Sequence, residues 1–247
     1  MWSWPAFFEF LTAPVMLSAA WMTVWLTIVS MLGGFAIGCL ITYMRTSKIR
    51  PIAVFAAFYV WIFRGTPLLV QLIIVYTGLP QVGIKFDAIT AAILTLALNE
   101  AAYLSEIIRA GLTSVPRGQL EAARSLGMSP RVVMVKVVFP QAFRIMIPPL
   151  GNSVNGMLKT TTLVSFISVT ELLRETQLLY QANFRVLEGL CAAAVYFLIM
   201  TTIWAFIQSR IEKRMNRSYA TDRGPKADRR KAPLERDLEL ISGGDQR

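Results

Sequence analysis

Polar side chains recur at helical spacing within one apolar stretch of this chain. Gln141, Arg144, Asn152, Asn155 and Lys159 are separated by intervals that place them on one face of an α-helix. Polar groups inside a bilayer are costly unless they face the protein interior or a water-filled cavity. Such a stripe is what a pathway for a polar solute requires. The same groups could also hydrogen-bond between packed helices, so both interpretations stay open.

A second polar group lies in an earlier apolar stretch. Asn99 and Glu106 share a helical face, and Glu100 lies beside them. Arg64, in another apolar stretch, could extend to the membrane interface, pair with Glu100 or bind an anionic group. Glu106 and Arg109 are one turn apart and are expected to form a local ion pair.

Catalytic and metal-binding patterns are not found in this sequence. It has no histidine, and its two cysteines, Cys39 and Cys191, both lie in apolar stretches. A phosphate-binding loop has its lysine directly after the second glycine, whereas two residues separate Gly156 from Lys159. We therefore expect no catalytic residues, no metal site and no bound cofactor.

The composition indicates an all-α integral membrane protein. Of the 247 residues, 55% are hydrophobic and only 16% are charged. About 20 apolar residues suffice to cross a bilayer. The chain is predicted to span the membrane five times, at residues 15–44, 52–79 with an interruption at 64–67, 87–108, 137–158 and 189–207.

The placement of positive charge predicts the orientation. Nineteen of the 25 Lys and Arg residues lie in connectors on one side of these spans or in the C-terminal tail. Because Lys and Arg accumulate on the cytoplasmic side, this side is expected to be the cytoplasm. The prediction is a periplasmic N-terminus at 1–14, a membrane domain at 15–209 and a charged cytoplasmic tail at 210–247 without ordered structure. The charge pattern does not indicate nucleic-acid binding.

A polar segment at about 117–136 separates the third span from the fourth. Glu121 to Leu126 reads as helix, and Gly127 can adopt the left-handed conformation that ends one. Ser129 is expected to cap a second short helix that starts at Pro130. Two short helices at an angle suit a groove in another protein. The same sequence pattern would also fit an ordinary helical hairpin between two spans.

This segment resembles the coupling segment of permease subunits in ATP-binding cassette importers. The resemblance lies in Glu121-Ala122-Ala123, in Gly127 and in the sequence Val-Val-Phe-Pro that ends at Pro140. Further strings resemble the polar amino acid subfamily. They are Phe63-Arg-Gly-Thr-Pro-Leu-Leu-Val-Gln71, Asn99-Glu-Ala-Ala-Tyr-Leu-Ser-Glu-Ile-Ile-Arg-Ala-Gly111, Pro148-Pro149 and Lys159-Thr-Thr-Thr-Leu163. Thr160 departs from the family, which usually has an acidic residue there.

The resemblance implies a type I importer permease fold with five transmembrane helices and a cytoplasmic coupling helix. It also implies two ATPase subunits that bind the ATP, a second permease chain that is identical or related, and a periplasmic amino acid binding protein. Coupling to the ATPase would fall to Glu121, Ala122, Ala123, Leu126 and Gly127. The substrate pathway would include Arg64, Asn99, Glu100, Asn152, Asn155, Lys159 and Thr161.

The predicted function is transport of a polar amino acid, or a derivative such as an opine, across the bacterial inner membrane. A membrane receptor or assembly protein that recruits a cytoplasmic partner would explain the coupling segment but not the polar stripe. An intramembrane enzyme is disfavoured because the sequence lacks histidine and a nucleophile–base pair.

Overall fold

The structure is a computed structural model that describes residues 2–220 and, for side chains, residues 2–215. Almost all of the described chain is helical. In chain order the elements are α1 (Trp4–Thr12), α2 (Pro14–Arg45), α3 (Arg50–Gly65), α4 (Leu68–Ile73), η1 (Ile74–Gly78), η2 (Leu79–Val82), α5 (Ala88–Thr113), α6 (Arg117–Ser125), α7 (Pro130–Val133), η3 (Met134–Val138), α8 (Phe139–Thr160), η4 (Thr161–Ile167), α9 (Leu172–Asn183) and α10 (Val186–Ala220).

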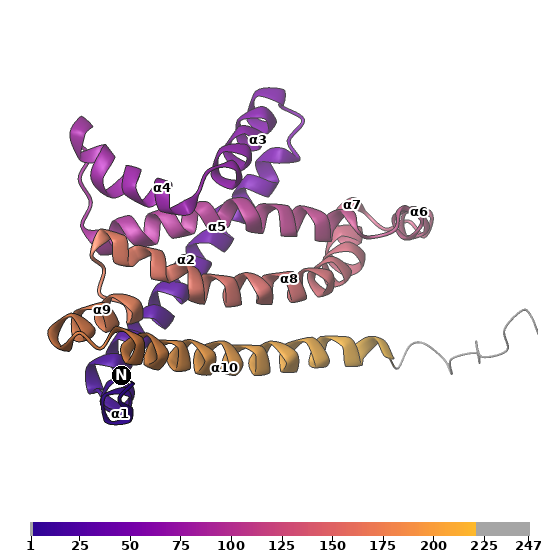
Figure 1. The fold of residues 1–247 in the computed structure, drawn as a ribbon. Helices are drawn as coiled ribbons and strands as arrows, with labels where there is room; N and C mark the ends of the chain where they lie inside the picture. The colour runs from indigo at the N-terminus through magenta and orange to yellow at the C-terminus, as the bar shows by residue number, and fades with distance from the viewer. Residues whose placement is uncertain (1, 221–247) are drawn as a thin grey trace, which may run out of the picture.

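The spans follow the predicted pattern. Among the described residues, four helical segments are long and apolar enough to cross a membrane, and the α3–α4 segment is a bent pair that makes a fifth if it counts as one span. The first predicted span corresponds to α2, the third to α5 and the fourth to α8, and α5, α8 and α10 lie side by side in Figure 1. The last helix is longer than predicted. A tail without ordered structure is predicted from residue 210, whereas α10 continues to Ala220. Residues 221–247 lie outside the described chain.

The break between α3 and α4 has a local cause. Proline disfavours the helical conformation in the residue before it, and Thr66 before Pro67 is extended, with φ −117° and ψ 143°. The two helices meet at a bend of 105°. The amide of Gln71 donates to the carbonyl of Phe63 at 3.0 Å and to that of Thr66 at 3.2 Å. Asn99 donates to the same Phe63 carbonyl at 3.0 Å, so α5 holds the end of α3 in place.

Helices α2 and α5 cross at close range because of two glycines one turn apart. A Cβ atom at Gly34 would lie 3.2 Å from the carbonyl oxygen of Ala97, and one at Gly38 would lie 3.1 Å from that of Ala101. The small-residue pattern Gly34-xxx-Gly38 therefore lets two backbones approach each other, as such patterns do in membranes. This contact fixes α5, which carries most of the polar residues described below.

The polar segment forms two short helices at one end of the bundle, where α6 and α7 are seen in Figure 1. Gly127 has a φ of +76°, as predicted for the residue that separates them. The second helix begins at Pro130, also as predicted. The side chain of Ser129 does not cap it by a hydrogen bond, although its backbone is extended. The predicted capping bond is therefore wrong, and the proline alone fixes the start of α7.

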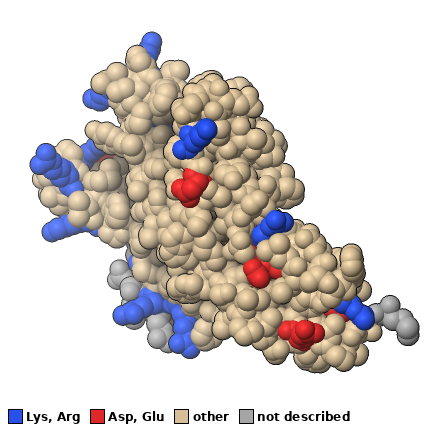
Figure 2. Space-filling view, turned by 90° about the vertical axis from the view of Figure 1, so that its left-hand side faces the viewer, with Lys and Arg blue, Asp and Glu red and all other residues tan. Residues whose placement is uncertain are grey.

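The opposite end of the bundle carries α1 and α9, as Figure 1 shows. The short N-terminal helix α1 was not predicted. It is held to α10 because the amide of Ser3 donates to Glu188 at 2.8 Å and the hydroxyl of Tyr196 donates to the carbonyl of Leu11 at 2.9 Å. Figure 2 views the molecule from this end and shows only scattered charged side chains on its face.

Candidate functional site

A cavity of about 450 Å³ lies where α3, α4, α5 and α8 meet. Three of the predicted pathway residues, Arg64, Asn99 and Glu100, line it. The full lining consists of Arg64, Leu68, Asn99, Glu100, Tyr103, Glu106, Ile107, Ser153, Gly156, Met157 and Thr160. The shared helical face predicted for Asn99 and Glu106 is thus a wall of this cavity.

Glu100 supplies to this cavity a carboxylate oxygen, Oε1, that accepts no hydrogen bond from the described residues. This atom is also buried. The hydroxyl of Ser153, on α8, is within hydrogen-bonding reach of the same carboxylate. Buried polar atoms almost always have a partner, and an unmet carboxylate in an apolar region is costly. The site therefore favours a donor or a cation at Glu100.

Three arginines surround the other carboxylate of the cavity, that of Glu106. Arg45 from α2 forms an ion pair with Oε1, and Arg109 donates to Oε2 from two nitrogens, at 2.7 and 3.0 Å. The predicted Glu106–Arg109 pair is confirmed. Arg64 from α3 lies 3.7 Å from Oε1, and its guanidinium lies 5.4 Å from the ring centre of Tyr103. Arg64 therefore contacts Glu106 rather than Glu100, and its more distant contact leaves its donors accessible from the cavity.

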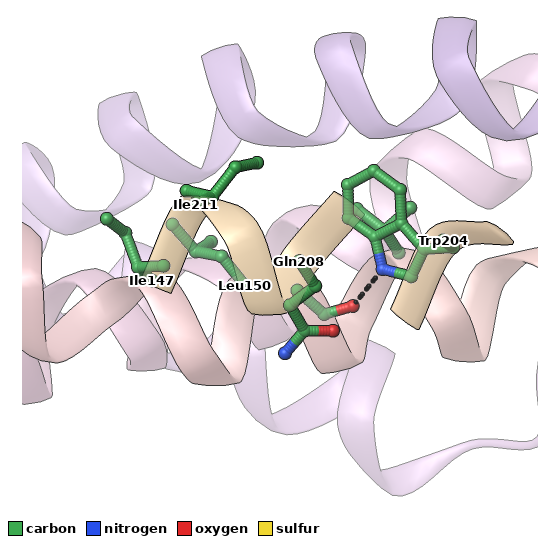
Figure 3. Close-up of a pocket in the computed structure, with 7 residues that line it drawn as sticks. Ile147, Leu150, Trp204, Gln208 and Ile211 are labelled. Carbon is green, nitrogen blue, oxygen red and sulfur yellow. Dashed lines mark hydrogen bonds between the residues drawn. The ribbon is translucent and has the colours of Figure 1, made fainter. Parts of the chain in front are cut away.

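The position of α8 beside this cavity depends on α10. The indole nitrogen of Trp204 donates to the carbonyl of Gly151 at 2.8 Å, as Figure 3 shows. Gln208 packs so closely that a Cβ atom at Gly151 would lie 2.3 Å from the Gln208 side chain. A second, mainly apolar cavity of about 150 Å³ remains between the two helices, bordered by Ile147, Leu150 and Ile211. Helix α8 continues through Pro148 and Pro149, and Gly151 allows α10 to dock just beyond them.

The remaining predicted pathway residues do not line the cavity. Asn152 and Lys159 are exposed on a neighbouring face of α8, and Asn155 is half-buried with its Oδ1 lacking a hydrogen-bond partner in the described chain. Thr161 is fully buried, and its hydroxyl donates to the carbonyl of Leu158 at 2.8 Å. The residues of α8 that do face the cavity include Ser153 and Gly156, neither of which is among the predicted pathway residues.

The second candidate site is the surface of α6 and the turn after it. Glu121 and Ala122 are exposed, and 82% of Leu126 is accessible. Ala123 is buried instead, in a core cluster that includes Val133 of α7. A large exposed leucine beside this turn is suited to a groove on another protein, because burial would remove its apolar surface from water.

Residues 34–217 match the model of the binding-protein-dependent transport system inner membrane component. The chain belongs to this family. The match begins within α2 and ends within α10, and it includes every residue that lines the cavity and the whole polar segment with α6 and α7.

Several relatives are similar over most of this chain. The glutamine transport system permease protein GlnP of Escherichia coli (strain K12) is 37% identical over 218 residues, which cover 87% of this chain and 97% of the relative. The L-cystine transport system permease protein TcyB of Bacillus subtilis (strain 168) is 38% identical over 208 residues, covering 84% and 89%.

Solved structures show the same fold. A crystal structure of an amino acid ABC transporter with histidines superposes with a TM-score of 0.78 at 40% identity, covering 81% of this chain and 94% of that one. The inward-facing MetNI methionine ABC transporter gives a TM-score of 0.68 at 20% identity, covering 87% and 99%. The fold is therefore that of an ABC importer permease, as predicted.

Family membership makes the chain a transport subunit and not an enzyme. A permease of this family works with an ATPase and with a binding protein that delivers the solute. Within the described residues, no group of three or more His, Cys, Asp or Glu side chains could hold a metal ion.

Proposed function

We propose that this chain is the membrane-spanning subunit of an importer for amino acids, and that the cavity bordered by Arg64, Glu100 and Gly156 receives the amino acid during transport. Relatives named for glutamine, cystine and arginine support an amino acid as the transported solute. The cavity lies between helices that would have to move apart on one side and together on the other as access alternates.

The observation that carries the proposal is the pairing of unlike charges across one cavity. Among the described residues, Glu100 presents a carboxylate oxygen without a hydrogen-bond partner, and Arg64 presents a guanidinium that lies 3.7 Å from Oε1 of Glu106. A free amino acid carries an ammonium and a carboxylate on the same carbon. Glu100 is suited to the ammonium, and Arg64 to the carboxylate, because a guanidinium can bind a carboxylate with two parallel hydrogen bonds.

The proposed motor is a pair of ATPase subunits, one of which receives α6 and the turn at Gly127. Leu126 enters its groove, Glu121 and Ala122 lie along the rim, and Ala123 anchors α6 to the permease. A second permease chain, identical or related, completes the membrane core. When the ATPases close on ATP, they carry the coupling helices with them and change which side of the membrane the cavity faces.

Reconstitution of the complex tests this function. Proteoliposomes that contain this chain, its partner subunits and the matching binding protein should hydrolyse ATP faster when an amino acid is supplied, and they should accumulate that amino acid. Amino acids that the binding protein does not bind serve as controls. ATP turnover that no amino acid changes, together with no uptake, would contradict the proposal and would favour a receptor that recruits a partner without moving solute.

The coupling surface is proposed to face the cytoplasm of the bacterial inner membrane, as the positive charge around it suggests. With Cys39 and Cys191 replaced by alanine, Ser129→Cys should react with a membrane-impermeant maleimide only after the inner membrane is opened. Gln81→Cys, an exposed position at the other end of the bundle, should react in intact spheroplasts. Labelling of Ser129→Cys from outside would invert the topology and exclude ATPase docking there.

A further inference from the structure

We infer that this cavity selects an amino acid whose side chain carries no charge, and that Gly156 provides the room for that side chain. The inference rests on the proposed function. It concerns which amino acids the permease itself accepts, apart from the choice made by the binding protein.

The carboxylates of the cavity leave no partner for a cationic side chain. Two carboxylates line it, those of Glu100 and Glu106. Both oxygens of Glu106 are occupied, since Arg45 pairs with Oε1 and Arg109 donates twice to Oε2. Only Glu100 remains for the ammonium group that every α-amino acid carries. A lysine or arginine side chain would therefore bring a second cation into the cavity without an anion to meet it, and such a charge is costly.

The cations of the cavity leave no partner for an acidic side chain either. Arg64 is the one Lys or Arg among the described residues that line it. Its side chain is 46% accessible and its contact with Glu106, at 3.7 Å, is longer than a hydrogen bond. Arg64 is thus available to the α-carboxylate, and a glutamate or aspartate side chain would find no second cation. The available charges of the cavity, on Glu100 and Arg64, match the α-ammonium and the α-carboxylate of one amino acid and leave none for a charged side chain.

Space for a side chain lies along α8. A Cβ atom placed on Gly156 would meet no atom within 4 Å. Ser153 and Thr160, each one turn from Gly156 on α8, and Asn99 on α5 are uncharged polar residues of the same lining. The amide nitrogen of Asn99 is already used, at 3.0 Å to Phe63 and 3.1 Å to Gln71, so its oxygen is the acceptor that remains. This end of the cavity suits an uncharged polar group such as an amide or a hydroxyl.

Binding to the purified complex without the binding protein tests the inference, because the permease then chooses alone. Radiolabelled glutamine, arginine and glutamate are compared by equilibrium binding to the complex of permease and ATPase subunits. We expect the affinity for glutamine to be on the order of tenfold higher, or more, than that for arginine or glutamate, because the side chain of each of these two leaves a charge unmatched. Arginine or glutamate binding as tightly as glutamine would overturn the inference while leaving the proposed function intact. A complex that binds none of the three and transports no amino acid would instead contradict the proposed function.

Two variants address the charge count and the space separately. Thr160→Asp adds one carboxylate to the lining and should raise the affinity for arginine, while Thr160→Asn, of similar size and uncharged, should not.

Gly156→Leu fills the open space and should abolish glutamine binding. Gly78→Leu, at a glycine whose nearest atoms are 3.9 Å away in η1, is the matched control and should bind glutamine normally. Basal ATP hydrolysis of each variant shows that the complex has assembled. Normal glutamine binding by Gly156→Leu would contradict the role of Gly156 in providing space. No gain of arginine binding in Thr160→Asp would contradict the argument from the charges of the cavity.

Discussion

Replacement of Leu126 by aspartate should uncouple this permease from its ATPase. Leu126 is 82% accessible at the tip of the coupling surface, and a negative charge in an apolar groove would have no partner there. Full burial of an exposed leucine side chain typically contributes about 2 kcal/mol, which corresponds to roughly a 30-fold change in affinity. We therefore expect Leu126→Asp to lose ATPase co-purification and amino acid uptake together, and Leu126→Ala to give an intermediate result.

The control for this variant is an equally exposed residue at the other end of the bundle. Val82 is 73% accessible and closes η2, so Val82→Asp should retain both ATPase association and uptake. The permease should reach the membrane in normal amounts in both variants, because neither side chain belongs to a core cluster. If Leu126→Asp still co-purified with the ATPase at wild-type yield, docking through this surface would be excluded.

Local chemistry explains the parts of the fold that the sequence predicts well. Thr66-Pro67 breaks a helix and Gly127 separates two helices because each effect depends on one or two residues and their backbone conformations. Helix α1 is different. Its start has a local signal, because Ser3 caps it and a proline lies in its first turn, but its position depends on Tyr196 and Glu188, which are remote in sequence. The placement of such an element against α10 depends on tertiary contacts that a single sequence does not display.

The candidate cavity shows the same limit within one helix. Spacing predicts that Asn152, Asn155 and Lys159 share a face of α8, but it does not say which face of α8 turns toward α5. Successive residues on an α-helix differ by about 100° in direction. Ser153 and Gly156, one position further along, therefore line the cavity with Glu100. Gly156 was not expected there because a glycine gives no polar signal, and its contribution is the space it leaves.

The long-range ion pairs could not be predicted from the sequence either. Arg45 and Glu106 are 61 residues apart, and they meet only because Gly34 and Gly38 bring α2 against α5. The sequence predicts the short-range pair with Arg109, because a helix places residues three apart on the same side. The full cluster joins α2, α3 and α5 through one carboxylate, which makes that carboxylate a point of high sensitivity.

Glu106→Gln should therefore be the most destabilising conservative change in this region. The side chain of Glu106 is 21% accessible and that of Arg45 is 22%, so solvent screens their pairing only in part. The variant keeps the shape of the side chain but leaves the guanidiniums of Arg45 and Arg109 without their counter-charge. Breaking a partly buried ion pair on one side costs about 1–3 kcal/mol, because the remaining charges stay partly desolvated. We expect a clearly lower melting temperature and a lower yield of folded protein after detergent extraction.

A second change separates loss of charge balance from loss of packing. In Glu106→Gln combined with Arg45→Gln, one stranded cation is removed as well, so the double variant should recover part of the lost stability, as expected for residues in one charge network. Glu9→Gln, on the exposed side of α1, is the control and should melt like the wild-type chain. The measurement is thermal unfolding of the purified permease in one detergent, followed by fluorescence. Two results would show that the carboxylate does not hold these three helices together. One is an unchanged melting temperature in Glu106→Gln. The other is a double variant whose melting temperature falls below that of Glu106→Gln as far as the loss of a second, independent contact would lower it.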